Sequence, residues 1–150
     1  MRQWILMSTA LLATACAGSN PAAPIDFSLQ LAETSPSAGL YEAADPVTGS
    51  KVWLHGTPLL TNADVERASV TRDEHGMSAV EIWVVESARP RFREATRNHM
   101  RKPIAIVVDG KVAVVAEIKS VLSSRFVIAG RYTPEEAAAV AAGITASRRP

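Results

Sequence analysis

The sequence predicts one α+β domain in which a mostly antiparallel sheet packs against two or three helices. Two apolar runs, 103–108 and 111–118, flank an Asp-Gly pair at 109–110, which is typical of a tight β-hairpin turn. Residues 80–84 alternate at the two-residue period of a strand. A Thr-Pro-Glu-Glu segment at 133–136 combines a helix N-cap, a first-turn proline and a capping-box glutamate. The 150 residues, 47% hydrophobic and 21% charged, suit one domain that folds in water.

The amino terminus has the pattern of a secretory signal peptide over residues 1–15. Arg2 gives a weakly positive start, and an apolar run follows at 4–13. This run is too short to span a bilayer comfortably, and it ends in small residues, as cleaved signal peptides do. We therefore expect the protein to be exported.

Cys16 is the single cysteine of the chain, and two interpretations of the cleavage before it are open. The preceding residues resemble a bacterial lipobox, in which the cysteine becomes lipidated, although Ala13 stands where that motif usually has leucine. Alternatively, signal peptidase cleaves after Ala15 and leaves Cys16 as a free thiol. We favour lipidation, because no second cysteine is present to pair with an exported thiol. Ala17, which is not aspartate, favours the outer membrane by resemblance to Gram-negative lipoproteins.

Residues 16–38 are interpreted as the lipidated cysteine and an Ala/Ser/Pro-rich tether. Pro21, Pro24 and Pro36 and the weak periodicity of this stretch favour an extended linker. The alternative is an added edge strand at 27–31, where three apolar side chains alternate.

The folded domain is predicted over residues 39–147, with a first strand at 51–55 and a helix that starts at Thr61. The Thr61 hydroxyl suits an N-cap, and the Asp64 carboxylate suits the positive end of a helix.

A β-hairpin follows, because the strand-like segments 69–73 and 78–85 flank a turn that contains Gly76. The second segment places an apolar side chain at every second position, which commits one of its faces to the core. Trp83 lies on the opposite face. Packing against the sheet is the usual role of such a tryptophan, and a peptide-binding surface is the alternative.

The next helix is predicted over residues 88–100, and it carries a stripe of positive charge. Arg89, Arg93 and Arg97 are spaced by four residues and so share one face, where like charges cost about 0.2–0.5 kcal/mol per pair. The stripe is either a solvated helix face or a contact for anionic lipid or an acidic partner. With Trp83, these arginines form the candidate partner surface.

The second half of the chain supplies the rest of the sheet. The two strands of the hairpin at 103–118 are nearly continuous in hydrophobicity, which predicts middle strands covered in part on both faces. A strand at 125–129 follows, and the last helix begins after Thr133 and is ended or loosened by Gly143.

The sequence contains no arrangement that predicts catalysis, a cofactor or a metal site. His55, His75 and His99 have no ligand-like spacing to one another or to a cysteine, so no zinc site is indicated. No serine lies in a G-x-S-x-G elbow, and no glycine-rich phosphate loop follows a strand. The 16 basic and 15 acidic residues give no basic surplus for nucleic acid. We therefore expect a binding protein that is not an enzyme.

Segments at 60–65, 80–85, 103–112 and 128–137, with Phe92 between them, are similar in order and in sequence to a known family. The most specific are Pro-Ile-Ala-Ile-Val-Val-Asp-Gly-Lys-Val at 103–112 and Ile-Ala-Gly-Arg-Tyr-Thr-Pro-Glu-Glu-Ala at 128–137. They resemble the head subdomain of the first periplasmic domain of SecD, a subunit of the bacterial Sec protein-export machinery. The resemblance implies a SecD head-like fold and a domain that contacts exported polypeptides on the far side of the membrane.

The chain departs from that family in two places. It reads Ala-Val-Val-Ala at 113–116, where the family usually has a Ser-Ala-Pro-like stretch. It ends at Pro150, where the family continues toward its transmembrane helices. The resemblance therefore carries over the fold and a tendency to bind polypeptide, and not the proton-driven motor function.

Two functional hypotheses follow. The leading one is a lipoprotein on the periplasmic side of a bacterial envelope that binds exported or unfolded polypeptide at an exposed sheet edge, as an accessory to protein translocation. The alternative is a structural or regulatory lipoprotein that docks a folded envelope protein. A free Cys16 thiol would instead make the protein a soluble periplasmic factor. No cofactor and no nucleic acid are expected as partners.

Overall fold

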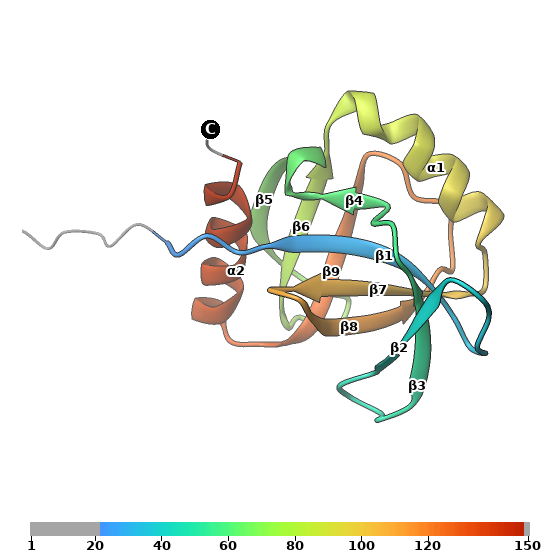
Figure 1. Cartoon of the computed structure of the whole chain (residues 1–150). Coiled ribbons are helices and arrows are strands. Elements are labelled where there is room, and N and C mark those ends of the chain that lie inside the picture. The colour runs from blue at the N-terminus through green and yellow to red at the C-terminus, as the bar shows by residue number, and fades with distance from the viewer. Residues whose placement is uncertain (1–21, 149–150) are drawn as a thin grey trace, which may run out of the picture.

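The computed structural model describes residues 22–148, in which strands form two antiparallel sheets and two α-helices pack beside them (Figure 1). The predicted α+β class is confirmed. The predicted signal peptide at 1–15 and Cys16 lie outside the described residues. Within the described part, neither helix is long and apolar enough to cross a membrane.

The larger sheet has the strand order β2-β3-β1-β7-β8, and the short β4 pairs with β1 beside β3. Its strands are β1 (Phe27–Glu33), β2 (Leu40–Ala44), β3 (Lys51–His55), β4 (Leu60–Thr61), β7 (Pro103–Val108) and β8 (Lys111–Glu117). Because β3 and β4 share one edge of β1, the chain between them, residues 56–58, bows away from that edge, and the Leu59 N–H returns to the Leu29 carbonyl at 2.7 Å.

The smaller sheet has the order β5-β6-β9, and α2 packs against β5 and β6. Its strands are β5 (Val65–Arg72), β6 (Ser78–Val84) and β9 (Arg125–Tyr132). The helices are α1 (Arg89–Asn98), α2 (Pro134–Ala146) and two 3-10 turns, η1 (Asn62–Asp64) and η2 (Glu86–Ala88).

Strand β1 corrects the expectation of a tether over residues 16–38. It lies inside the larger sheet, paired with β7 on one side and with β3 and β4 on the other. Phe27 and Leu29 are at most 1% exposed. Pro24 and Pro36 flank the strand and so do not interrupt its hydrogen bonds. The alternation at 27–31, interpreted as an optional edge strand, is therefore the signature of an internal one.

The prediction of a helix that starts at Thr61 is also wrong. The capping interaction exists, since the Thr61 backbone N–H donates to Asp64 Oδ2 at 2.9 Å, but it closes only the three-residue turn η1. Val65 then begins β5, which pairs with β6 along its length. A local cap determines where a helical turn begins but not how many residues it includes. Here the pairing of the following residues with β6 determines that they form a strand.

Both predicted hairpins are confirmed. Asp109 and Gly110 have φ values of 49° and 77°, the left-handed conformation that a two-residue turn with the twist of the strands requires. Strand β7 is covered on both faces, with Ile104 and Ile106 in one core cluster and Ala105 in the other. Strand β8 is different: it is the edge of the sheet, and the prediction of two central strands is wrong for it.

The main core lies between the two sheets and is closed by both helices. Phe92 of α1 packs on Phe126 of β9 with ring centroids 5.6 Å apart, and Ile144 of α2 is fully buried. The predicted cap of α2 is confirmed, because Thr133 Oγ1 accepts from the backbone N–H of Glu136 at 3.2 Å. The smaller second cluster covers the other face of the larger sheet; its residues are Ala32, Val52, Leu54, Ala105 and Val107.

Candidate functional site

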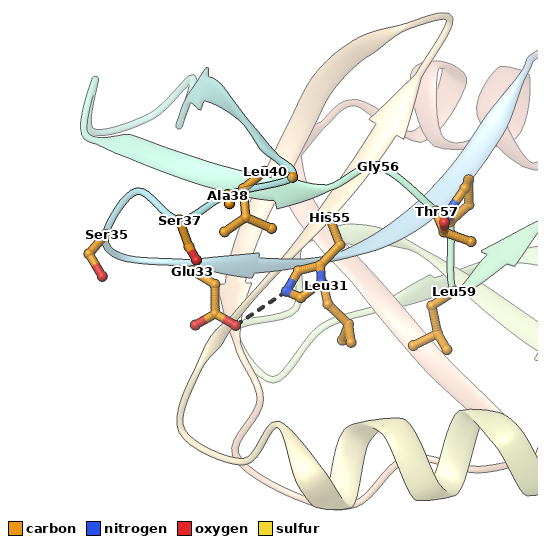
Figure 2. A pocket seen from close by; sticks show the side chains of 12 residues that line it. Leu31, Glu33, Ser35, Ser37, Ala38, Leu40, His55, Gly56, Thr57 and Leu59 are labelled. Atoms are coloured by element: carbon orange, nitrogen blue, oxygen red, sulfur yellow. Dashed lines mark hydrogen bonds and ion pairs between the residues drawn. The ribbon is translucent and has the colours of Figure 1, made fainter.

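The bow between β3 and β4 opens a cavity of about 700 Å³ against the edge of β1. The turn that connects β1 to β2 forms its other wall. Figure 2 shows Ser37 and Leu40 at the end of the cavity next to the β1–β2 turn, Glu33 and His55 in its middle, and Leu59 at its other end. The lining residues include Leu31, Leu40 and Leu59 and the polar Glu33, Ser37 and His55.

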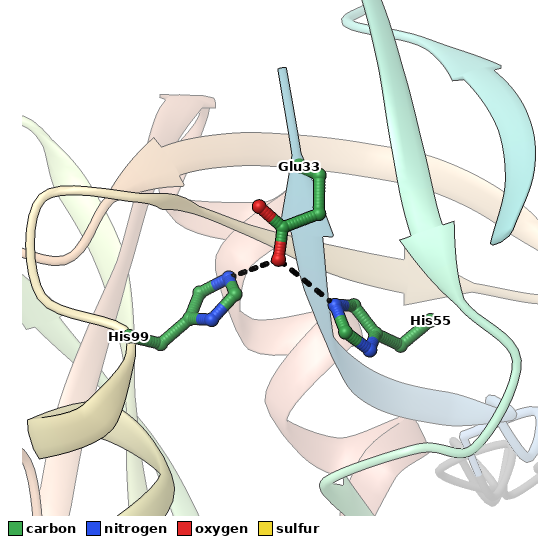
Figure 3. Close-up of side chains that lie close together, drawn as sticks. All are labelled: Glu33, His55 and His99. Atoms are coloured by element: carbon green, nitrogen blue, oxygen red, sulfur yellow. Dashed lines mark hydrogen bonds and ion pairs between the residues drawn. The ribbon is translucent and has the colours of Figure 1, made fainter. Parts of the chain in front are cut away.

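Glu33 is the centre of a charged cluster at one side of this cavity (Figure 3). His55 Nε2 lies 3.2 Å from its Oε1, and His99 Nε2 lies 3.6 Å from the same oxygen. Lys102 Nζ contacts the second oxygen, Oε2, at 3.2 Å. The cluster joins the ends of β1 and β3 to the segment that follows α1.

The environment lowers the pKa of Glu33 below its ordinary value. Partial burial acts in the opposite direction and raises it, but the hydrogen bonds from His55 and Lys102 and the nearby positive charges of His99 and Lys102 outweigh that burial. The carboxylate is therefore ionised at neutral pH and attracts cationic or electrophilic groups.

His99 is the buried member of the cluster, only 7% exposed. It is the residue that caps the carboxyl end of α1. Its Nε2 donates to the Ala32 carbonyl oxygen at 2.8 Å, which fixes the ring between the helix and β1. Its ring meets that of His55 edge-on, with centroids 5.7 Å apart.

Sequence spacing gave no sign of this cluster. His55 and His99 lie 22 and 66 residues from Glu33 in the chain, and only the pairing of β1 with β3 and the return of the chain after α1 bring them together. His75, by contrast, lies in an exposed turn.

A second candidate site lies at the β8 edge. Among the described strands, β8 pairs only with β7, so its other edge is open. An apolar cavity of about 240 Å³ adjoins it, between the two sheets. Ala116 and Ile118 line this cavity from the β8 side, and Phe126 and Val127 line it from β9; Val127 is 46% exposed.

The residues of the predicted partner surface have different environments in the structure. Arg89 is held in place, because its Nε donates to the Val84 carbonyl at 3.0 Å and its Nη2 pairs with Glu66 at 3.1 Å. Arg93 and Arg97 are exposed on α1, and neither takes part in an ion pair with another described residue.

Trp83 lies on the outer face of the smaller sheet and is partly buried there. Its ring is covered by the guanidinium groups of Arg67 and Arg125, at 4.6 and 5.2 Å from the centroid. Its Nε1 donates to Glu81 Oε2 at 3.1 Å. These contacts agree with the packing role, and a role for Trp83 or the α1 arginines in partner binding stays a prediction.

Most of the chain is similar to one group of known proteins. Residues 38–148 match the family model described as SecDF, P1 head subdomain. The protein translocase subunit SecD of Rhodobacter capsulatus is 32% identical over 133 residues, which cover 88% of this chain and 22% of that protein. SecDF of Thermus thermophilus is 34% identical over 87 residues, which cover 57% of this chain and 12% of that protein.

Two solved structures have a similar fold. A crystal structure of SecDF in its super-membrane-facing form superposes with a TM-score of 0.65 at 21% identity, over 83% of this chain and 19% of that one. A second, of a membrane component SecDF that enhances protein export, has a TM-score of 0.64 at 21% identity, over 83% of this chain and 63% of that one. The chain thus spans between 12% and 22% of the two sequence relatives named above.

Proposed function

The chain belongs to the SecDF P1 head subdomain family, and we propose that it is an envelope lipoprotein that binds exported or unfolded polypeptide as an accessory to protein translocation. The family connects it to translocation. The polypeptide binding, the lipid anchor and the periplasmic location are our proposals.

The open edge of β8 is the observation that carries the binding proposal. Exposed edges in natural sheets are usually protected by a lysine, a proline or a bulge, because an extended chain can otherwise add to them as a new strand. The register of β8 shifts at Ala113, where a bulge leaves one residue unpaired with β7. Beyond this bulge, the segment 114–116 is apolar and regular. We propose that a guest strand pairs with β8 from Val114 onward.

The cavity between β8 and β9 provides the second half of the proposed site. A strand added to β8 directs alternate side chains to the two faces of the sheet. Those on the face that packs against β9 lie beside the apolar cavity lined by Ile118, Phe126 and Val127. The guest is therefore an extended segment with an apolar residue at every second position, which exported chains expose before they fold.

The anchor proposal rests on residues outside the described part of the chain. We propose that cleavage after Ala15 leaves Cys16 lipidated, with Ala17 favouring the outer membrane. Since the Ile25 backbone N–H donates to the Gly143 carbonyl of α2 at 3.1 Å, the proposed tether ends by residue 24 and does not extend to residue 38. Eight extended residues reach at most about 29 Å, so the domain would stay near the membrane surface.

The alternative function, docking of a folded envelope protein, is favoured by a different observation. Arg93 and Arg97 project from α1 as exposed cations, and an acidic surface on a folded partner would complement them. Crosslinking in the envelope separates the two functions, because one stoichiometric partner indicates docking and many clients indicate capture.

A binding titration with edge variants tests the proposal. The probe is a fluorescently labelled exported polypeptide kept unfolded by substitution, and fluorescence anisotropy measures its binding. Ala116→Lys places a charge at the exposed end of β8, and we expect it to weaken binding at least about tenfold. Ala44→Lys is the matched control, because Ala44 is an exposed alanine in β2, at the opposite edge of the same sheet.

Equal binding by the two variants would argue against the β8 edge, and no saturable binding by the unsubstituted protein would end the capture proposal. The anchor is tested separately, by intact mass and membrane fractionation of the chain beside its Cys16→Ser variant. Acylation that disappears in the variant supports the lipoprotein, and an unmodified Cys16 in the soluble fraction supports the free-thiol alternative.

A further inference from the structure

Three side chains far apart in the sequence direct ligand atoms at one point of the structure. Glu33 ends β1, His55 ends β3 and His99 follows the last turn of α1 (Figure 3). One nitrogen or oxygen from each lies within 4.8 Å of the others. We infer that Glu33, His55 and His99 bind one divalent transition-metal ion of the zinc type.

The spacing of the ligand atoms fits a tetrahedral ion. With metal bonds of about 2.1 Å, two ligand atoms of such an ion lie about 3.4 Å apart. Glu33 Oε1 is 3.2 Å from His55 Nε2 and 3.6 Å from His99 Nε2, so the observed distances lie on either side of that value. The ligand atoms of His55 and His99 lie within 4.8 Å of each other, so adjustment of the two rings would bring all three atoms to one ion.

The ligand types select the class of ion. Two imidazoles and a carboxylate form a set that zinc binds in proteins, commonly with the fourth position open to water or another ligand. Glu33 and His55 also line the cavity of about 700 Å³ between β3 and β4. The cavity thus gives an ion a path of entry and leaves room for a small ligand beside it.

The contacts around the cluster hold its ligands in place. Lys102 Nζ binds Oε2 of Glu33, which leaves Oε1 for the ion. A ligating carboxylate is commonly oriented by such an outer partner. The Lys102 side chain is 51% exposed, so water screens its repulsion of a cation.

His99 must lose a proton to act as a ligand. Its Nε2 donates to the Ala32 carbonyl oxygen at 2.8 Å, and an ion replaces that proton. An ion about 2.1 Å from Nε2 cannot lie on the line to the Ala32 oxygen, which is only 2.8 Å away, so the ring turns toward Glu33 as the hydrogen bond breaks. Binding of the ion therefore has to outweigh the loss of this hydrogen bond.

The competing explanation is that the cluster is only a set of ion pairs that holds β1, β3 and the end of α1 together. The two explanations differ in a measurable property. A cluster of ion pairs alone binds no metal ion. The inferred site, in contrast, binds one equivalent of Zn²⁺, and this binding stabilises the folded domain.

Calorimetric titration with Zn²⁺ tests the inference on the full chain carrying Cys16→Ser, so that no thiol competes for the ion. Glu33→Gln and His55→Ala remove ligands that are partly exposed, and circular dichroism checks that each variant is folded. His75→Ala is the matched control, since His75 is exposed and outside the cluster. Co²⁺ serves as a second probe, because its visible absorption reports a tetrahedral site.

We expect one equivalent of Zn²⁺ to bind to the parent and to His75→Ala with equal affinity, and at least about tenfold more weakly to Glu33→Gln and His55→Ala. We also expect Co²⁺ to give tetrahedral bands that Zn²⁺ abolishes. Absence of saturable binding to the folded parent, or equal binding by His55→Ala and His75→Ala, overturns the inference.

Discussion

The Asn62 side chain accepts a hydrogen bond from the backbone N–H of Phe27, with Oδ1 and N 2.8 Å apart. Its Nδ2 donates to the carbonyl oxygens of Ile25 at 2.9 Å and of Ile144 at 3.3 Å. One residue of the η1 turn thus ties the beginning of β1 to the end of α2, so both ends of the described chain are held at one place.

Replacing Asn62 by alanine should therefore destabilise the whole domain. The substitution leaves the Phe27 N–H and the Ile144 carbonyl without this partner, while Ser147 Oγ still donates to the Ile25 carbonyl, and we expect a cost of about 1–3 kcal/mol. Chemical denaturation measures the free energy of unfolding. Asn98→Ala, at an exposed position of α1, is the control and should change it by less than about 0.5 kcal/mol. Equal effects would contradict the role assigned to Asn62.

Phe27→Ala distinguishes a strand from a tether. Phe27 is fully buried in the main core, so its truncation should cost about 3–5 kcal/mol of unfolding free energy. Val47→Ala, at a side chain that is 79% exposed, should cost less than about 0.5 kcal/mol. A loss below about 1 kcal/mol for Phe27→Ala would mean that the segment before residue 38 is dispensable for folding.

Replacing Gly143 by alanine should not stabilise the domain, although replacing a glycine inside a helix by alanine usually does. Gly→Ala inside a helix ordinarily stabilises by up to about 1 kcal/mol. At Gly143, however, an added Cβ would lie 2.6 Å from the Ile25 side chain and 2.8 Å from the Ala23 carbonyl oxygen. We expect Gly143→Ala to be destabilising, and Ile25→Ala to relieve part of that effect in the double variant. Thermal unfolding of the four chains of this cycle measures the coupling. Strict additivity would contradict the contact.

The three arginines of the α1 stripe should behave differently from one another. Arg89→Ala removes the hydrogen bond to the Val84 carbonyl and the pair with Glu66, and we expect a loss of about 1 kcal/mol. Arg93→Ala and Arg97→Ala remove exposed cations and should change the unfolding free energy by less than about 0.5 kcal/mol. A loss of envelope crosslinks in these two variants, with unchanged stability, would instead support the docking alternative.

Local patterns in the sequence were sufficient for much of the fold. The turn at 109–110, the alternation at 80–84 and the cap at Thr133 each depend on neighbours in the chain, and each was predicted correctly. The same reasoning failed at Thr61, where a real cap begins only one turn because pairing of β5 with β6 takes over.

The features that sequence reasoning missed depend on distant contacts. Strand β1 has a short apolar alternation inside a proline-rich stretch, and only its pairing with β7 and β3 makes it part of the core. The cluster of Glu33, His55 and His99 has no characteristic spacing for the same reason. The apolar alternation at 27–31 was the one local signal of strand β1. No local signal marked the cluster of Glu33, His55 and His99.

Amide hydrogen exchange, measured with and without an unfolded exported polypeptide, shows directly whether the β8 edge pairs with a guest strand. We expect slower exchange on binding in the segment 114–118 and in the facing part of β9, with exchange in β2 unchanged. Protection confined to α1, or no change in β8 at saturating polypeptide, would contradict it.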